Sequence, residues 1–108
     1  MKIGESFNLE TTVKYAEEAV VSKTLIDKGI GNITLFAFDA GQGLSEHTSP
    51  FDAVVHIIDG EAAITIGGKG QTLKNGEMII MPANIPHALK ANIPFKMVLT
   101  MIRKKVEC

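Results

Sequence analysis

Apolar and polar residues alternate with a period of two along most of the chain after residue 20. This period is typical of β-strands, because successive side chains of a strand point to opposite faces. The alternating runs are short and end at glycine, proline, Asp-Gly or Asn-Gly, and they predict about eight strands: VVSKTLID, NITLFAFDA, AVVHIID, EAAITIGG, QTLK, EMIIMPA, HALKA and FKMVLTMIR. Their near-regular spacing predicts an all-β fold, an antiparallel sandwich or barrel.

Turn residues separate these runs. Asp59-Gly60 and Asn75-Gly76 suit tight hairpins, because both dipeptides tolerate positive φ. The GGKG sequence predicts a turn, since it lacks the spacing and the following helix of a phosphate-binding loop.

Only the first quarter of the chain has a helical pattern. In NLETTVKYAEEAV, residues 8–20, Leu9, Val13 and Ala16 have helical spacing and Asn8 can cap the first turn. We therefore expect one domain over residues 1–108: a short N-terminal helix and a strand in 1–30, a barrel core in 31–103 and a charged tail in 104–108.

The strand DAVVHII has two different faces. Ala53, Val55 and Ile57 form a uniformly apolar set, which we expect to face the interior. The other set also contains polar residues and should face outward, and it consists of Asp52, Val54, His56 and Ile58. An outward face that keeps two large aliphatic side chains favours a homodimer interface over open water.

Composition narrows the classes of partner. The 108 residues contain 11 basic and 12 acidic side chains, a formal net charge of −1, which argues against broad electrostatic binding to nucleic acid or to a membrane surface. The chain shows neither a secretory signal nor an apolar run long enough to span a bilayer, so we expect a cytoplasmic protein. The single cysteine, Cys108, excludes a disulfide framework, and we expect it to be an exposed, inert thiol.

Three histidines, His47, His56 and His87, are the candidates for chemistry. Neutral imidazole is a common ligand for transition metals, so His47 and His87 from different parts of one barrel could hold a metal ion. A third ligand is not evident from spacing, and Glu46, Ser49 and Asp52 are only near His47 in sequence. The alternative reading is that each histidine is a hydrogen-bonded or surface residue.

The sequence GQGLSEHTSPFDAVVHIIDG resembles the first motif of the small single-domain cupins. Gly41 precedes His47 by six positions, and Gly60 closes the motif, as in that family. The second histidine of the motif is replaced by Ser49, and its glutamate is replaced by Ala53.

The sequence GEMIIMPANIPHALKA resembles the second cupin motif. Gly76, Pro82 and His87 match, whereas Asn84 stands in place of a glycine and Ala91 in place of the terminal asparagine. Together the two motifs lie within residues 35–103, and the resemblance implies a jelly-roll β-barrel of six to eight strands that is usually dimeric.

In metal-binding cupins two histidines and the glutamate of the first motif, with the histidine of the second, hold a divalent ion. By this resemblance only His47 and His87 remain as metal ligands for Fe, Ni, Zn or Mn. Four arrangements stay open: His56 completes a three-histidine site, Asp52 or Glu46 enters from the loop, water or substrate atoms complete a two-histidine site, or no metal binds.

We expect a small-molecule-binding cupin whose pocket contains His47, Ser49, Ala53, Val55 and His87. The alternative is a metal-dependent isomerase, dioxygenase or decarboxylase that uses His47 and His87, and a third possibility is acid–base catalysis by these histidines without a metal. The sequence therefore leaves open whether the protein is an enzyme. The numerous methionines are interpreted as flexible core fillers, some of which could line an adaptable apolar pocket.

Overall fold

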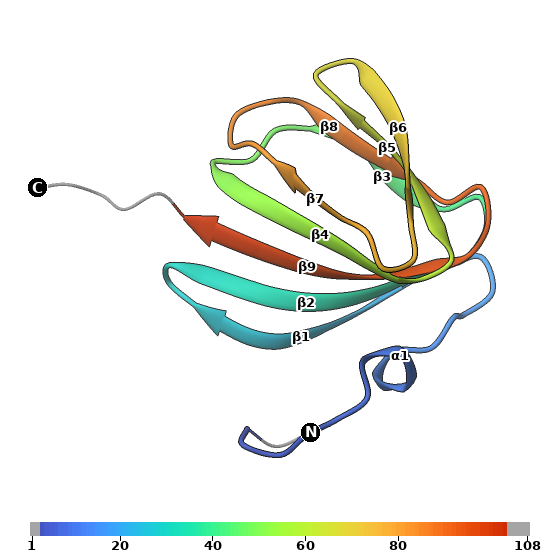
Figure 1. Cartoon of the computed structure of the whole chain (residues 1–108), viewed down its shortest axis with the longest axis vertical. Coiled ribbons are helices and arrows are strands. Elements are labelled where there is room, and N and C mark those ends of the chain that lie inside the picture. Colours follow the sequence, from blue (N-terminus) through green and yellow to red (C-terminus); the bar gives the residue numbers. More distant parts are fainter. Residues whose placement is uncertain (1–2, 104–108) are drawn as a thin grey trace, which may run out of the picture.

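The computed structural model describes residues 3–103 of the chain as two facing antiparallel sheets, preceded by a short helix (Figure 1). The helix is α1 (Leu9–Thr12), and the strands are β1 (Val20–Lys28), β2 (Gly31–Phe38), β3 (Gly43–His47), β4 (Phe51–Asp59), β5 (Glu61–Ile66), β6 (Lys69–Lys74), β7 (Met78–Met81), β8 (His87–Lys90) and β9 (Phe95–Arg103). The larger sheet has the order β1-β2-β9-β4-β7, and the smaller one has the order β3-β8-β5-β6. The predicted all-β class is confirmed. The predicted charged tail, 104–108, lies outside the described residues, as does Cys108.

The chain passes repeatedly between the two sheets, and this corrects two predicted hairpins. Asp59-Gly60 joins β4 of the larger sheet to β5 of the smaller one, and Asn75-Gly76 joins β6 back to β7. Both glycines do have positive φ, 71° for Gly60 and 86° for Gly76, so the turns form but link strands that do not pair. Two-residue hairpins occur instead at the predicted GGKG turn between β5 and β6, where Ile66 pairs with Lys69, and between β1 and β2, where Lys28 pairs with Gly31.

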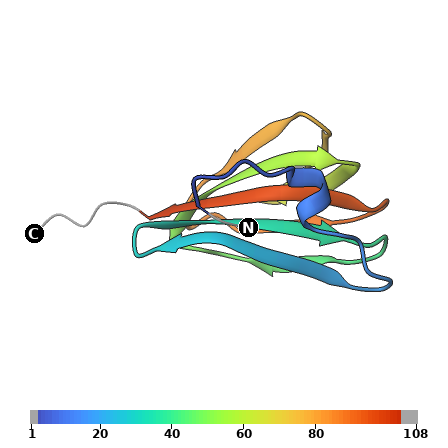
Figure 2. The ribbon, with the colours of Figure 1, turned by 90° about the horizontal axis from the view of Figure 1, so that it is seen from below.

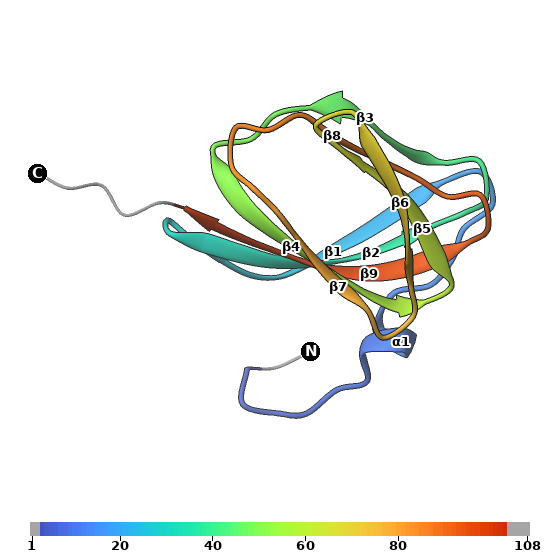
Figure 3. The ribbon, with the colours of Figure 1, turned by 45° about the horizontal axis from the view of Figure 1, so that its top comes forward.

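The interior lies between the sheets, as the view in Figure 3 shows. The predicted inward set of β4 is confirmed, because Ala53, Val55 and Ile57 are each at most 2 % exposed. They pack with Phe38 and Phe95, whose rings stack at 4.5 Å between centroids. Strand alternation in β4 is therefore a correct guide to which side chains reach the interior.

The N-terminal segment lies outside the sheets, in Figures 1 and 2 alike. The helix predicted over residues 8–20 is limited to Leu9–Thr12, and Asn8 caps it by accepting a hydrogen bond from the Thr11 N–H at 3.0 Å. Helix formation ends at Val13, which is extended and is buried against Leu35 and Ala37 on the outer face of the larger sheet. Tertiary packing of Val13 therefore overrides the helical periodicity.

Polar contacts also hold the N-terminal segment in place, in addition to the packing of Val13. Tyr15 donates a 2.5 Å hydrogen bond to Asp59, and the Lys96 ammonium lies 4.9 Å from the Tyr15 ring centre and donates to the Glu10 carbonyl. Burial, and after it the hydrogen bond and the charge of Asp59, raise the pKa of the Tyr15 hydroxyl above its ordinary value. In residues 3–103 no helix has the length and apolar character needed to cross a membrane.

Candidate functional site

Two of the three histidines are neighbours across one strand pair. His47 ends β3 and His87 begins β8, and the two residues are direct partners in the register of these antiparallel strands. Their rings meet edge to face with centroids 4.4 Å apart. His87 is buried, at 5 % exposure, whereas His47 is exposed. The pair therefore has one ring in the interior and one ring in contact with solvent.

A bulge in β3 turns His47 inward. Leu44 pairs with Leu89, and the next pair is His47 with His87. Between these two pairs β3 advances by three residues and β8 by only two. Strict alternation would place positions 44 and 47 on opposite faces, and the extra residue brings both to the interior side. His47 is thus the last residue of a short, mostly exposed strand, which is absent from the eight strands that the sequence predicts.

Backbone carbonyls orient both imidazoles. Nδ1 of His47 lies 2.6 Å from the Ser45 carbonyl oxygen, and Nδ1 of His87 lies 3.2 Å from that of Ile85. A carbonyl oxygen can only accept, so the hydrogen of each neutral ring is on Nδ1. The Nε2 atom of each ring therefore keeps a free lone pair, which can accept a hydrogen bond or bind a cation.

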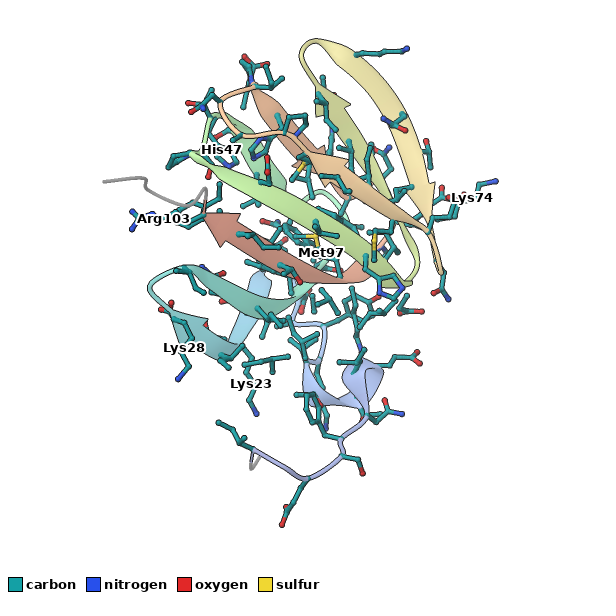
Figure 4. All side chains as sticks on the ribbon, turned by 60° about the vertical axis from the view of Figure 1, so that its left-hand side comes forward. Lys23, Lys28, His47, Lys74, Met97 and Arg103 are labelled. Carbon is teal, nitrogen blue, oxygen red and sulfur yellow. The ribbon has the colours of Figure 1, made fainter. Side chains whose placement is uncertain are left out.

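The two rings border a small cavity of about 50 Å³ between the sheets. It is lined by Leu44, His47, Ala53, Met81, His87, Leu89, Met97, Leu99 and Met101. Of these, His47 and Met97 are labelled in Figure 4, and they come from β3 of the smaller sheet and β9 of the larger sheet. A volume of this size accommodates a few water-sized groups, since one water needs about 10–15 Å³ on the same measure. The two imidazoles are the only polar side chains among the lining residues.

The wall opposite the histidines consists of one row across three strands. Ala53 of β4 pairs with Met81 of β7 on one side and with Met101 of β9 on the other. Directly paired residues share a face, so all three side chains belong to the inner side of the larger sheet. The small side chain of Ala53 leaves space between two thioethers.

The other predicted site residues lie away from the cavity. Val55 is fully buried in the closed core, and the Ser49 hydroxyl accepts a hydrogen bond from the Phe51 N–H in the loop before β4. His56 is on the face of β4 opposite Ala53, and Asp52 accepts a hydrogen bond from the Ala83 N–H. Glu46 is exposed and is not a lining residue. The structure thus brings together His47, His87 and Ala53 from the predicted set.

These residues do not fit the divalent site of the metal-binding cupins. Ala53 offers no donor where a glutamate would stand, and Ser49 is bound elsewhere. In residues 3–103 no group of three histidine, cysteine, aspartate or glutamate side chains is close enough to hold an ion. Two imidazoles alone fall short of the usual three or four protein ligands.

The sequence favours core filling as the role of the methionines that line the cavity. Their sequence signal is alternation: Met97, Leu99 and Met101 share one face of the last strand. That face was recognisable from the sequence, but the pairing of Met101 with Ala53 requires the strand order, which alternation does not give.

Comparison with known proteins places this geometry in a family. Residues 34–102 match the family model described as "Cupin domain". A conserved protein of unknown function from Streptococcus pyogenes is 35 % identical, with a TM-score of 0.92 over 98 % of this chain and 93 % of that one. A cupin superfamily protein from Desulfitobacterium hafniense is 26 % identical, with a TM-score of 0.90 over 96 % of this chain and 95 % of that one.

Two further relatives are matched over only about half of their own length. A cupin 2 conserved barrel domain protein from Leptotrichia buccalis is 40 % identical, with a TM-score of 0.87 over 90 % of this chain and 47 % of that one. An uncharacterized protein of Streptomyces coelicolor is 32 % identical over 56 residues, 52 % of this chain, and the match spans about half (53 %) of the relative's own length. The double sheet, the two motifs and these matches agree, and the chain belongs to the cupin family as a small cupin 2 domain.

Proposed function

We propose that the protein binds a small ligand in the cavity between its sheets, with the two paired imidazoles as the polar recognition groups. The observation that carries this proposal is the composition of the cavity, where apolar side chains surround only His47 and His87. Binding sites for small molecules have this character, since apolar walls supply affinity and a few polar groups fix orientation.

The tautomers indicate which polar group the ligand presents. Each Nδ1 is engaged by a carbonyl, so a neutral ring offers Nε2 as an acceptor. A neutral ligand with an N–H or O–H donor therefore complements the pair better than a carboxylate, whose oxygens would meet two acceptors. The volume of about 50 Å³ favours a short apolar tail over a sugar or a nucleotide.

A titration followed by NMR tests this proposal. Butanamide, as a probe with two N–H donors and a short tail, should shift the resonances of His87, Leu89 and Met97 with saturable, millimolar affinity, on the order expected for a very small ligand. Butyrate at the same pH should bind more weakly, because it lacks a donor.

A matched pair of variants locates the binding. Ala53→Leu fills the cavity and should abolish the shifts, whereas Val54→Leu places the same residue type on the opposite face of the same strand and should leave them unchanged. Equal shifts in both variants, or no saturable shift in the wild type, would contradict the proposal.

A further inference from the structure

Sulfur and nitrogen donors face each other across the cavity. His47 and His87 on the smaller sheet present two Nε2 lone pairs, and Met81, Met97 and Met101 on the larger sheet line the same space. Two of these methionines flank Ala53 directly on the neighbouring strands. Methionine is unbranched and flexible, so its sulfur can adjust toward a ligand within a cavity of this size.

The charge and the softness of these donor atoms indicate which kind of metal ion they would bind. Imidazoles and thioethers are neutral, and a carboxylate or thiolate is absent from the lining residues. Burying a cation among apolar walls is costly, and the cost is lower for one charge than for two. Hard ions such as Mg²⁺ and Ca²⁺ prefer oxygen ligands, whereas thioethers are suited to monovalent copper.

We propose that the cavity is a binding site for Cu(I), held by Nε2 of His47 and His87 and by the thioether sulfur of Met81 or Met101. This inference rests on the proposed function only in that the cavity admits a small species, and it goes beyond it, because Cu(I) would occupy the same two Nε2 lone pairs in place of a hydrogen-bond donor. Ala53 stands where the family motif has a glutamate. This replacement suits Cu(I), because a carboxylate at that position would favour harder ions in the space that the sulfurs occupy.

Anaerobic titration of the purified protein with Cu(I), in competition with a chromophoric Cu(I) chelator, tests the proposal. The wild type should withdraw about one equivalent of copper from the chelator, and X-ray absorption of the complex should show both nitrogen and sulfur scatterers. Zn²⁺ should bind more weakly relative to its own chelator, because neutral thioethers are poor ligands for it.

Isosteric variants identify the sulfur donors. Met81→Leu with Met101→Leu removes both thioethers with little change in volume, and should weaken Cu(I) binding about tenfold or more and abolish sulfur scattering. Met78→Leu changes an exposed methionine on the outer face of β7 and should leave the affinity unchanged. If the double variant fails to fold, each single variant carries the same test by its own loss of sulfur scattering.

Three results would overturn the copper site: no transfer of copper from the chelator, unchanged affinity in the double variant, or a complex with nitrogen scatterers alone. Butanamide binding in a protein that rejects Cu(I) would retain the proposed function while the copper inference fails. If both ligands fail to bind, the cavity has neither role.

Discussion

At the scale of single residues, the backbone of Asn84 connects the two motif loops. Its φ is 65°, in the left-handed region, where the family motif has glycine. Its N–H donates a 2.7 Å hydrogen bond to the Ser49 carbonyl, which joins the loop before His87 to the loop after His47. Asparagine is among the few residues other than glycine that adopt this conformation readily, so the motif tolerates the replacement.

This conformation makes Asn84 sensitive to the choice of substituent. Because Asn84 is exposed, Asn84→Ala removes little packing but places alanine in the left-handed region, at a cost of about 1–2 kcal/mol in the free energy of unfolding. Thermal unfolding should show a loss of roughly 4–8 °C in Tm or more. Asn84→Gly is the control and should retain the wild-type Tm within a few degrees. An alanine variant as stable as the glycine variant would show that the left-handed backbone is not constrained here.

At the scale of elements, Gly60 is where β4 leaves the larger sheet for the smaller one. A Cβ at Gly60 would collide with the Pro94 carbonyl oxygen and would lie 3.1 Å from the Phe95 Cα, whereas a Cβ at Gly76, also with positive φ, would meet nothing within 4 Å. Gly76→Ala should therefore cost about 1–2 kcal/mol from φ alone. Gly60→Ala should cost about 1–3 kcal/mol more, because backbone has to move. Urea denaturation measures both, and equal losses would refute close packing at the crossover.

The same elements show what the sequence can and cannot predict. Alternation placed Ala53, Val55 and Ile57 in the interior correctly, because β4 is regular over these positions and its outer face is partly polar. It failed for β3, where four of five residues are exposed and a bulge reverses the faces before His47. Asp59-Gly60 is a dipeptide that favours a hairpin turn. Whether the strands on either side of the turn pair depends on packing between the sheets, which a dipeptide does not determine.

At the scale of the whole molecule, the outer face of the larger sheet is covered unequally. The N-terminal segment covers Leu35 and Ala37 through Val13. Toward the β7 edge the outward residues Met78 and Ile80 are 58 % and 62 % exposed, and they adjoin the half-buried Val54. Apolar side chains gathered on a sheet face of a small protein are typical of an interaction surface. Because Met81 faces the cavity from the same strand, a partner on this face would also stabilise one wall of the site.

We propose that a second copy of the chain covers this face, as the outward Val54 of β4 predicts, whereas the outward Ile58 packs against the cluster around Val13. Sedimentation equilibrium at about 10–50 µM should then give a dimer, since an interface of about 800 Å² per partner is sufficient for stable association. Ile80→Lys should shift the equilibrium toward monomer, because it would bury an unpaired charge at the interface. Thr72→Lys adds the same charge on an exposed position of β6 in the other sheet and should remain dimeric. The proposal fails if the wild type sediments as a monomer, or if the two lysine variants sediment with the same mass. This face would then be open to solvent or contact a different partner, and the cavity would belong to a single chain acting alone.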